Sequence, residues 1–347
     1  MSELAKTSPL DTLELTSDFR VGEAQNLYQA RQKSKAISKS INGQLCYLDS
    51  DIHKDYQAAY YCNDYLFQEG KKVTARFCRK RNCIMCSRIK AAEYMKSYGV
   101  ALLDLPELQL VTLTAPNVCA ADLDNEIDYL YVAFAKIKDN IRKNYKDLKI
   151  VGLRKLEVTY NHITDKYNPH YHIIVSGKEV ADTILNLWLK QFKGAKRKGQ
   201  DVRSIKDKGA LIEVFKYVTK AIVKQTFNPI AVDQMYRSIK NRRTIQPMGI
   251  KKLKVPKLNT YASNEITHRS ERIEVWKWCK NEKDWYSVGG EKFNDTYIDK
   301  DANKVIKIIE STKVVKYEKK TRREESYDTR ITVDRSNRSC QKVEFDD

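Results

Sequence analysis

The sequence lacks any apolar run long enough to cross a bilayer as a helix. Its most apolar stretch, residues 100–121, is interrupted by Asp104, Pro106 and Glu107. Residues 1–19 place acids among apolar residues and lack the hydrophobic segment of a signal peptide. We therefore expect a cytoplasmic protein with no membrane partner. In that reducing compartment, the eight cysteines should be metal ligands or buried thiols rather than disulfides.

The chain also has fewer acidic than basic residues. The chain has 45 Asp and Glu against 64 Lys and Arg, a net charge of +19. A surplus of this size favours a polyanionic partner, of which nucleic acid is the commonest. Hydrophobic residues make up 41% of the 347 residues, which is enough for a core and excludes wholesale disorder. The length accommodates one large domain or two to three modest ones.

The hydrophobic pattern predicts an α+β fold. Short apolar runs next to turn residues predict strands, and apolar residues at steps of three and four predict helices. The predicted strands are residues 110–114, 151–160, 170–175 and 202–205, and the predicted helices are 123–141, 180–192 and 210–224. The second and third strands are close in sequence and should pair as an antiparallel hairpin.

Composition divides the chain into five predicted parts. They are a helical lead-in (1–55), a Cys-rich basic segment (56–100), a central domain (101–257), an accessory element with three tryptophans (258–315) and a mobile tail (316–347). Within the central domain, the basic segment 241–257 contains Pro247 and Gly249, and we expect it to be a loop on the rim.

Only five histidines occur, and two of them, His170 and His172, stand two positions apart on a predicted strand. Residues two apart on a strand point to the same face, so the two imidazoles should lie side by side. Imidazole is a common ligand for divalent metals. The pair therefore predicts a metal site, although two histidines on the polar face of a half-exposed strand would give the same pattern.

Glu157 is the acid that we expect to complete this site. If the hairpin turn is centred near Thr164–Asp165, Glu157 lies opposite His172, which gives a two-histidine, one-acid site with open positions. Glu157 stands in an apolar run, where an unpaired acid is costly. The alternatives are a salt bridge to Arg154–Lys155 or simple exposure, and His162 in the turn is an alternative ligand.

Glu213 and Tyr217 lie one helical turn apart in the segment 210–224. The apolar stripe of this predicted helix leaves both residues, with Lys220, on its opposite side. Tyrosine can act as a covalent nucleophile, and a nearby carboxylate can act as a general base. Alone this signal is weak, because the chain has 21 tyrosines and acid–base pairs are routine on helix surfaces.

A group of cysteines predicts a zinc site. Its members are Cys62, Cys78, Cys83 and Cys86. The spacings within the last three suit a tetrahedral zinc ion, and four thiolates would make the site structural because no coordination position stays open. Cys46 or His53 could replace Cys62 as the fourth ligand, and free thiols remain an alternative.

Basic residues in three segments are candidate DNA contacts. They are Arg76, Arg79, Lys80, Arg81 and Arg88 around the cysteines, Lys196, Arg197 and Lys198 in a loop, and Arg242 and Arg243.

These constellations, in this order, resemble the rolling-circle plasmid replication initiators of the HUH endonuclease superfamily, in the group with a single catalytic tyrosine. The resemblance runs from about Cys62 to Lys257. It is carried by the cysteine segment 77–88, the strand motif 110–118, the metal motif 156–172, the tyrosine motif 213–220 and the stretch 242–249.

The resemblance implies a central, about five-stranded antiparallel sheet flanked by helices, with residues 101–257 as the nicking domain. It implies Mg²⁺ or Mn²⁺ at His170, His172 and Glu157. Tyr217 would attack the DNA backbone and form a 5′-phosphotyrosine, and Glu213 would activate water to end the cycle. Lys220 would hold a phosphate oxygen or tune the tyrosine, unless it is simply exposed.

The implied partners are plasmid origin DNA, with a single-stranded or hairpin nick site and a duplex binding site, and the host helicase and polymerase. Three alternatives stay open. A relaxase of this superfamily usually carries its tyrosine before the histidine pair, whereas Tyr217 follows His172. A single-tyrosine transposase is typically shorter and lacks the cysteines. A non-enzymatic zinc-containing nucleic-acid-binding protein would leave the histidine pair unexplained.

Overall fold

The computed structural model describes residues 21–69, 72–205, 211, 214, 227–253, 273–293 and 300–311. The predicted tail 316–347 and the predicted catalytic residues Glu213, Tyr217 and Lys220 lie outside the described residues. Among the helices of this described part, none is long and apolar enough to cross a membrane.

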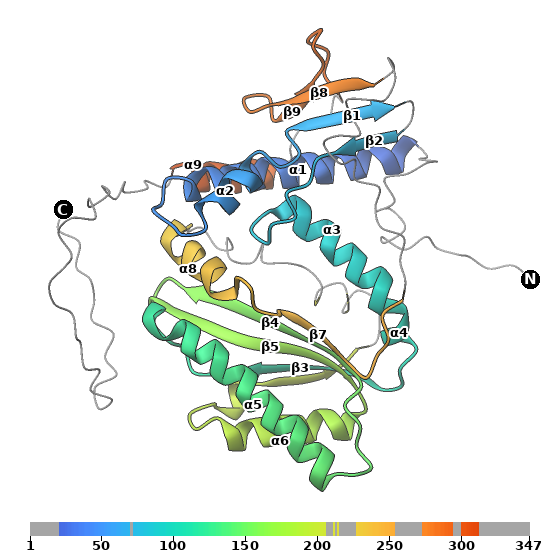
Figure 1. The fold of residues 1–347 in the computed structure, drawn as a ribbon, viewed down its shortest axis with the longest axis vertical. Coiled ribbons are helices and arrows are strands. Elements are labelled where there is room, and N and C mark those ends of the chain that lie inside the picture. Colours follow the sequence, from blue (N-terminus) through green and yellow to red (C-terminus); the bar gives the residue numbers. More distant parts are fainter. Residues whose placement is uncertain are drawn as a thin grey trace, which may run out of the picture.

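The structure has two layers, and a five-stranded antiparallel sheet, which we call the large sheet, forms the centre of the larger layer (Figure 1). Its strands, in spatial order, are β6 (Asp201–Ser204), β3 (Leu108–Thr114), β5 (Lys166–Ser176), β4 (Gly152–Asn161) and β7 (Ile245–Met248). The long antiparallel hairpin β4–β5, which the closeness of its two strands in sequence predicts, lies in the middle of the sheet. The predicted α+β class with a five-stranded antiparallel sheet is confirmed.

Two amphipathic helices cover one face of this sheet, α5 (Leu123–Asn144) and α6 (Lys178–Gln191) (Figure 1). Their buried residues recur at steps of three and four and pack against Tyr171, Ile173 and Val175 of β5. Because side chains alternate along a strand, His170, His172 and Ile174 then point to the other face.

That other face, which carries the histidines, is partly covered by an apolar cluster. Leu110, Leu153 and Ile174 contribute to it from the sheet, and Met95 and Leu102 contribute from the helices that follow α3. Helix α3 spans Ile84–Tyr94, and the helices that follow it are the π-helical turn η2 (Met95–Gly99) and α4 (Val100–Leu103). The helical residues Leu211 and Val214 belong to the same cluster.

The segment 241–257 is not simply a loop, so that prediction was wrong for its central part. Residues 245–248 form β7, which pairs with β4 through contacts such as Leu153 opposite Pro247. Proline cannot donate to a sheet ladder, and an edge strand tolerates it because only one side of the strand is paired. Ile245 and Met248 are buried, which stabilises the strand despite the proline.

A second antiparallel sheet has four strands, β2 (Lys72–Ala75), β1 (Tyr65–Glu69), β8 (Glu274–Cys279) and β9 (Asp284–Tyr286), in that order. One face packs on α1 (Val21–Leu45) and α9 (Lys300–Ser311), as Figure 1 shows. Strands from the predicted parts 56–100 and 258–315 therefore share one sheet. The domain boundaries themselves stay a prediction.

Helix α1 joins the two layers. Its residues Ile41 and Leu45 enter the core of the large sheet, whereas Tyr28 and Ala36 pack under the small sheet. The short helices α2 (His53–Tyr60) and α8 (Pro229–Ile239) lie between α1 and the large sheet (Figure 1). The buried Asp233 of α8 accepts hydrogen bonds from Ser50 and Tyr56, which fixes α8 against α2. The remaining short turns are η3 (Ala120–Asp122) and η4 (Arg197–Gly199).

Candidate metal centres

Glu157, His170 and His172 meet on the face of the large sheet opposite α5 and α6. One potential ligand atom from each lies within 4.8 Å of the others. Oε2 of Glu157 is 3.7 Å from Nε2 of His170 and 3.5 Å from Nε2 of His172. Ligand bonds of about 2.1 Å put neighbouring ligand atoms about 3.0 to 3.4 Å apart, so these three side chains fit a divalent ion with little movement.

The strand register differs from the one that the sequence predicts. Glu157 pairs with His170 rather than with His172, and Lys155 stands opposite His172. The turn spans residues 162–165, and the Asn161 side chain accepts from the backbone N–H of Ile163. The turn centre thus lies about one residue earlier than expected. Each pairing moves by two positions as a result, which keeps Glu157 on the face of both histidines.

Each histidine ring is oriented by a polar contact at its Nδ1 atom. Nδ1 of His170 lies 3.0 Å from the carbonyl oxygen of Asn168. A carbonyl can only accept, so this nitrogen carries the proton and Nε2 keeps its lone pair for a metal. Nδ1 of His172 lies 3.1 Å from Oγ1 of Thr112 on the neighbouring strand β3. The sequence analysis did not identify Thr112, because only the strand pairing brings it to the histidine.

Lys155 holds the second carboxylate oxygen of Glu157. Its side chain is 2% exposed, and its ammonium group pairs with Oε1, while Oε2 faces the histidines. Burial alone would raise the pKa of Glu157, but the neighbouring imidazoles of His170 and His172 and the charge of Lys155 hold it well below its usual value. The carboxylate is therefore ionised, as a metal ligand must be. The salt bridge to Lys155 that the sequence offered as an alternative coexists with the three-residue group. His162 is exposed in the turn and is not part of it.

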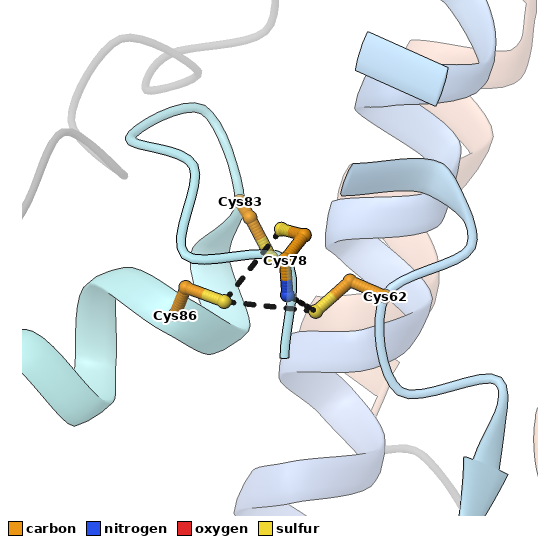
Figure 2. Close-up of side chains that lie close together, drawn as sticks. All are labelled: Cys62, Cys78, Cys83 and Cys86. Atoms are coloured by element: carbon orange, nitrogen blue, oxygen red, sulfur yellow. Dashed lines mark hydrogen bonds between the residues drawn. The ribbon is translucent and has the colours of Figure 1, made fainter. Parts of the chain in front are cut away.

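The four cysteines also come together, as Figure 2 shows. Sγ of Cys86 lies 3.6 Å from Sγ of Cys62 and 3.6 Å from Sγ of Cys78. A tetrahedral zinc ion with bonds of about 2.3 Å separates its sulfur ligands by about 3.8 Å, so the four thiols fit zinc closely. Cys62 takes the fourth position in this group, which includes neither Cys46 nor His53. Backbone N–H groups of Cys78 and Arg79 donate to the sulfurs of Cys62 and Cys86, as thiolates in such sites require.

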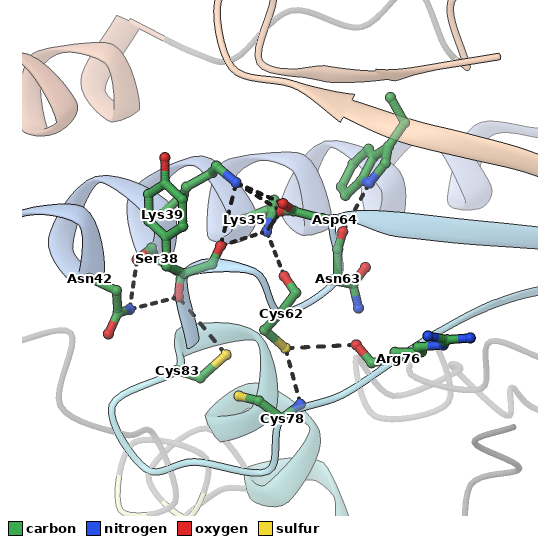
Figure 3. A network of polar contacts seen from close by, with 12 residues as sticks. Lys35, Ser38, Lys39, Asn42, Cys62, Asn63, Asp64, Arg76, Cys78 and Cys83 are labelled. Carbon is green, nitrogen blue, oxygen red and sulfur yellow. Dashed lines mark hydrogen bonds and ion pairs between the residues drawn. The ribbon is translucent and has the colours of Figure 1, made fainter. Parts of the chain in front are cut away.

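Helix α1 supports the cysteine loops with polar side chains (Figure 3). Ser38 lies 3.9 Å from Sγ of Cys83 and accepts a hydrogen bond from the N–H of Ile84. The buried ammonium group of Lys35 donates to the carbonyl oxygen of Cys62 and pairs with Asp64. Burial lowers the pKa of Lys39, which lies beside Lys35 and also pairs with Asp64. No local pattern in the sequence predicts these contacts, because they join segments more than twenty residues apart.

The buried amides of Asn42 and Asn82 fix the cysteine loop to α1, and we expect Asn42→Ala to destabilise the protein. Asn82 donates to Asn42 at 2.7 Å, and Asn42 donates to the carbonyl oxygen of Ser38. The substitution removes these partners at a buried site, at a cost of about 1–3 kcal/mol in the free energy of unfolding. Thermal unfolding should show a melting temperature several degrees lower, whereas Gln29→Ala, exposed on the same helix, should leave it unchanged. Equal melting temperatures for both variants would contradict this role.

Several basic residues predicted to contact DNA make contacts within the protein. Arg81 donates to the carbonyl oxygens of Ile239 and Arg242, and Arg242 pairs with Asp124 and Asp128 of α5. In the same way, Lys80 pairs with Asp55, and Arg88 donates to α1. The remaining predicted contacts are exposed: Arg76, Arg79, Lys196, Arg197, Lys198 and Arg243.

The structure is thus that of an α+β protein with two groups that could hold metal ions, a histidine–acid group on a five-stranded antiparallel sheet and a four-cysteine group. The model of the replication protein family matches residues 69–288, which is more than half of the chain. The chain therefore belongs to the replication protein family, and the resemblance to plasmid replication initiators is confirmed. The sheet that bears the paired histidines is consistent with the HUH superfamily.

Curated relatives named "Protein rep" are similar to parts of the chain. The relative from Staphylococcus aureus is 29% identical over 163 residues, which cover 43% of this chain and 66% of the relative. That from Streptococcus pneumoniae serotype 2 is 27% identical over 203 residues, or 51% of this chain and 61% of the relative. That from a Bacillus species is 28% identical over 163 residues. The chain thus spans between half and two thirds of the length of these relatives. No solved structure matches the chain.

Proposed function

We propose that this protein initiates rolling-circle replication of a plasmid by nicking one strand at the origin and later rejoining it. The observation that carries the proposal is the group of Glu157, His170 and His172, built into a replication-family fold with its ligand atoms already converged. A non-enzymatic DNA-binding protein would leave unexplained the two histidines whose Nε2 atoms both lie near one partly buried carboxylate.

Tyr217 is the proposed nucleophile. Its hydroxyl oxygen attacks the scissile phosphorus, the bond from phosphorus to the 3′ oxygen breaks, and the products are a 5′-phosphotyrosine and a free 3′-hydroxyl. Glu213 accepts a proton from the water that ends the cycle, and Lys220 holds a phosphate oxygen. The match of the replication protein family to residues 69–288, a range that includes the segment 213–220, supports this assignment.

His170, His172 and Glu157 would hold one Mg²⁺ or Mn²⁺ ion. When bound, such an ion supplies positive charge that polarises the scissile phosphate and offsets charge that develops on its oxygens. The protein's own contribution is orientation. The backbone carbonyl of Asn168 and the hydroxyl of Thr112 orient the two imidazoles, and Lys155 holds the carboxylate, which keeps the three groups close to the positions that a metal ion requires.

Cys62, Cys78, Cys83 and Cys86 would hold a structural Zn²⁺. Duplex and single-stranded origin DNA would contact the exposed basic residues of the cysteine segment and of the loop that contains Lys196, Arg197 and Lys198. A host helicase and polymerase would then act on the opened origin.

The proposal is tested by incubating the purified protein with its own supercoiled plasmid and either Mn²⁺ or Mg²⁺. We expect nicked circles with protein covalently attached to a 5′ end, and no product in EDTA. Binding without nicking under either ion, on supercoiled and on single-stranded origin DNA, would instead indicate a non-enzymatic zinc-containing DNA-binding protein.

Removal of one proposed metal ligand should separate metal chemistry from DNA binding. We expect His172→Ala to slow nicking about 100-fold or more and to abolish Mn²⁺ binding measured by calorimetry. His162→Ala is the matched control, because His162 is exposed in the turn of the same hairpin. If both variants nick and bind Mn²⁺ as the parent does, the three-residue group is not the metal site.

A further inference from the structure

The small sheet has one face that the described helices leave open. Leu66, Trp278 and Trp285 point toward α1 and α9, where they pack with Tyr28 and Ile306. Successive side chains of a strand point to opposite faces. The residues that alternate with these three therefore point away from the helices, on the side of the sheet turned from α1 in Figure 1.

Strand pairing sets these outward residues in two rows. Tyr65 of β1 stands opposite Lys277 of β8, and Lys277 stands opposite Tyr286 of β9. The adjacent row consists of Thr74, Phe67 and Val275, of which Thr74 and Phe67 are buried and Val275 is exposed. Cross-strand neighbours have their Cβ atoms about 5 Å apart, so the first row places a lysine between two tyrosine rings. We call these two rows the outer face.

The outer face combines aromatic rings with positive charge. The side chain of Tyr65 is 44% exposed, Lys277 is exposed, and Tyr286 is half-buried. The guanidinium of Arg76, which follows β2, lies 5.7 Å from the ring centroid of Phe67 and is exposed. Neither row contains an acid; Asp284, two residues before Tyr286, is buried and accepts a hydrogen bond from Tyr28, and the exposed Glu282 lies in the turn before β9.

We propose that the outer face binds single-stranded DNA, with bases stacked on Tyr65 and Tyr286 and phosphates held by Lys277 and Arg76. Proteins bind single-stranded nucleic acid through exposed aromatic rings next to cationic side chains, because every base has a face that can stack and every phosphate linkage carries a negative charge. The net charge of +19 adds long-range attraction. The inference rests on the proposed function only in identifying the ligand as the unpaired strand at an origin. The outer face includes none of the metal-binding residues.

Fluorescence anisotropy of the full chain with a fluorescein-labelled oligo(dT) of about 20 nucleotides tests the proposal directly. We expect Tyr65→Leu and Tyr286→Leu each to raise the dissociation constant about tenfold, because leucine keeps the apolar contact but cannot stack. Tyr65→Phe should bind like the parent. Lys277→Gln should weaken binding and reduce the slope of log affinity against log salt by about 0.7. Tyr145→Leu is the matched control, since Tyr145 is exposed at the end of α5.

Parental binding by Tyr65→Leu, Tyr286→Leu and Lys277→Gln would overturn the proposal, and equal losses for Tyr65→Phe and Tyr65→Leu would overturn stacking. Lys277 is exposed, so its variant reports binding even if a tyrosine variant fails to fold. Oligo(dT) contains no origin sequence, so the assay does not depend on nicking. If the variants lose oligo(dT) affinity as expected but the parent protein does not nick its plasmid, the proposed function is wrong. The outer face would then remain a DNA-binding surface.

Discussion

Tyr217→Phe should abolish the covalent protein–DNA adduct and reduce nicking below detection. Phenylalanine keeps the ring but lacks the oxygen that forms the ester with phosphorus, so no intermediate can form. The adduct is measured by denaturing gel electrophoresis of the protein after incubation with end-labelled origin DNA and Mn²⁺. DNA binding by the variant should be retained, because the hydroxyl oxygen is one small part of the interface.

Tyr171→Phe is the matched control for this experiment. Tyr171 stands between the two histidines in sequence, yet its ring points to the opposite face, where it packs against Phe134 and Trp188. Its hydroxyl group is buried and has no hydrogen-bond partner among the residues that the structure describes, and burial raises its pKa, so its loss should be tolerated. If Tyr217→Phe still forms an adduct, the nucleophile is another tyrosine. If Tyr171→Phe alone loses the adduct, the orientation of β5 described above is incompatible with the chemistry.

The geometry of the histidine–acid group follows from the sequence only in part. Alternation along the strand was sufficient to place His170 and His172 on one face, and the hairpin was sufficient to bring Glu157 to that face. The predicted cross-strand partner of Glu157, His172, lies two positions from the observed partner, His170, because the turn conformation depends on the Asn161 side chain. A shift of two positions keeps Glu157 on the same face of the sheet as both histidines, because side chains on a strand alternate with a period of two residues.

Contacts between distant segments could not be predicted from local patterns. Strand β1 pairs with β8, which lies about two hundred residues later, and neither strand is recognisable by length or alternation alone. Strand β7 was missed because Pro247 argues against a strand unless the strand lies at an edge. The support that Ser38 and Lys35 give to the cysteines depends on how α1 crosses the loops, which no spacing in the sequence encodes.

Cys86→Ser should remove the zinc ion and destabilise the whole chain. The sulfur of Cys86 contacts those of Cys62 and Cys78, and a serine hydroxyl is a poor zinc ligand at neutral pH. Structural zinc sites contribute on the order of 10 kcal/mol to folding, which exceeds the stability of many domains. Elemental analysis should therefore find one zinc per chain in the parent and none in the variant. Thermal unfolding of the variant should begin at a much lower temperature.

The control is Cys119→Ser. Cys119 lies outside the cysteine group and donates to Asp122, a contact that serine can also make. Since α1 packs on the cysteine loops, on the small sheet and on the core of the large sheet, loss of the zinc ion should unfold both layers in one transition. A variant that loses zinc but keeps full nicking activity would show that the two layers fold independently. A variant that keeps stoichiometric zinc would show that Cys86 is not a ligand.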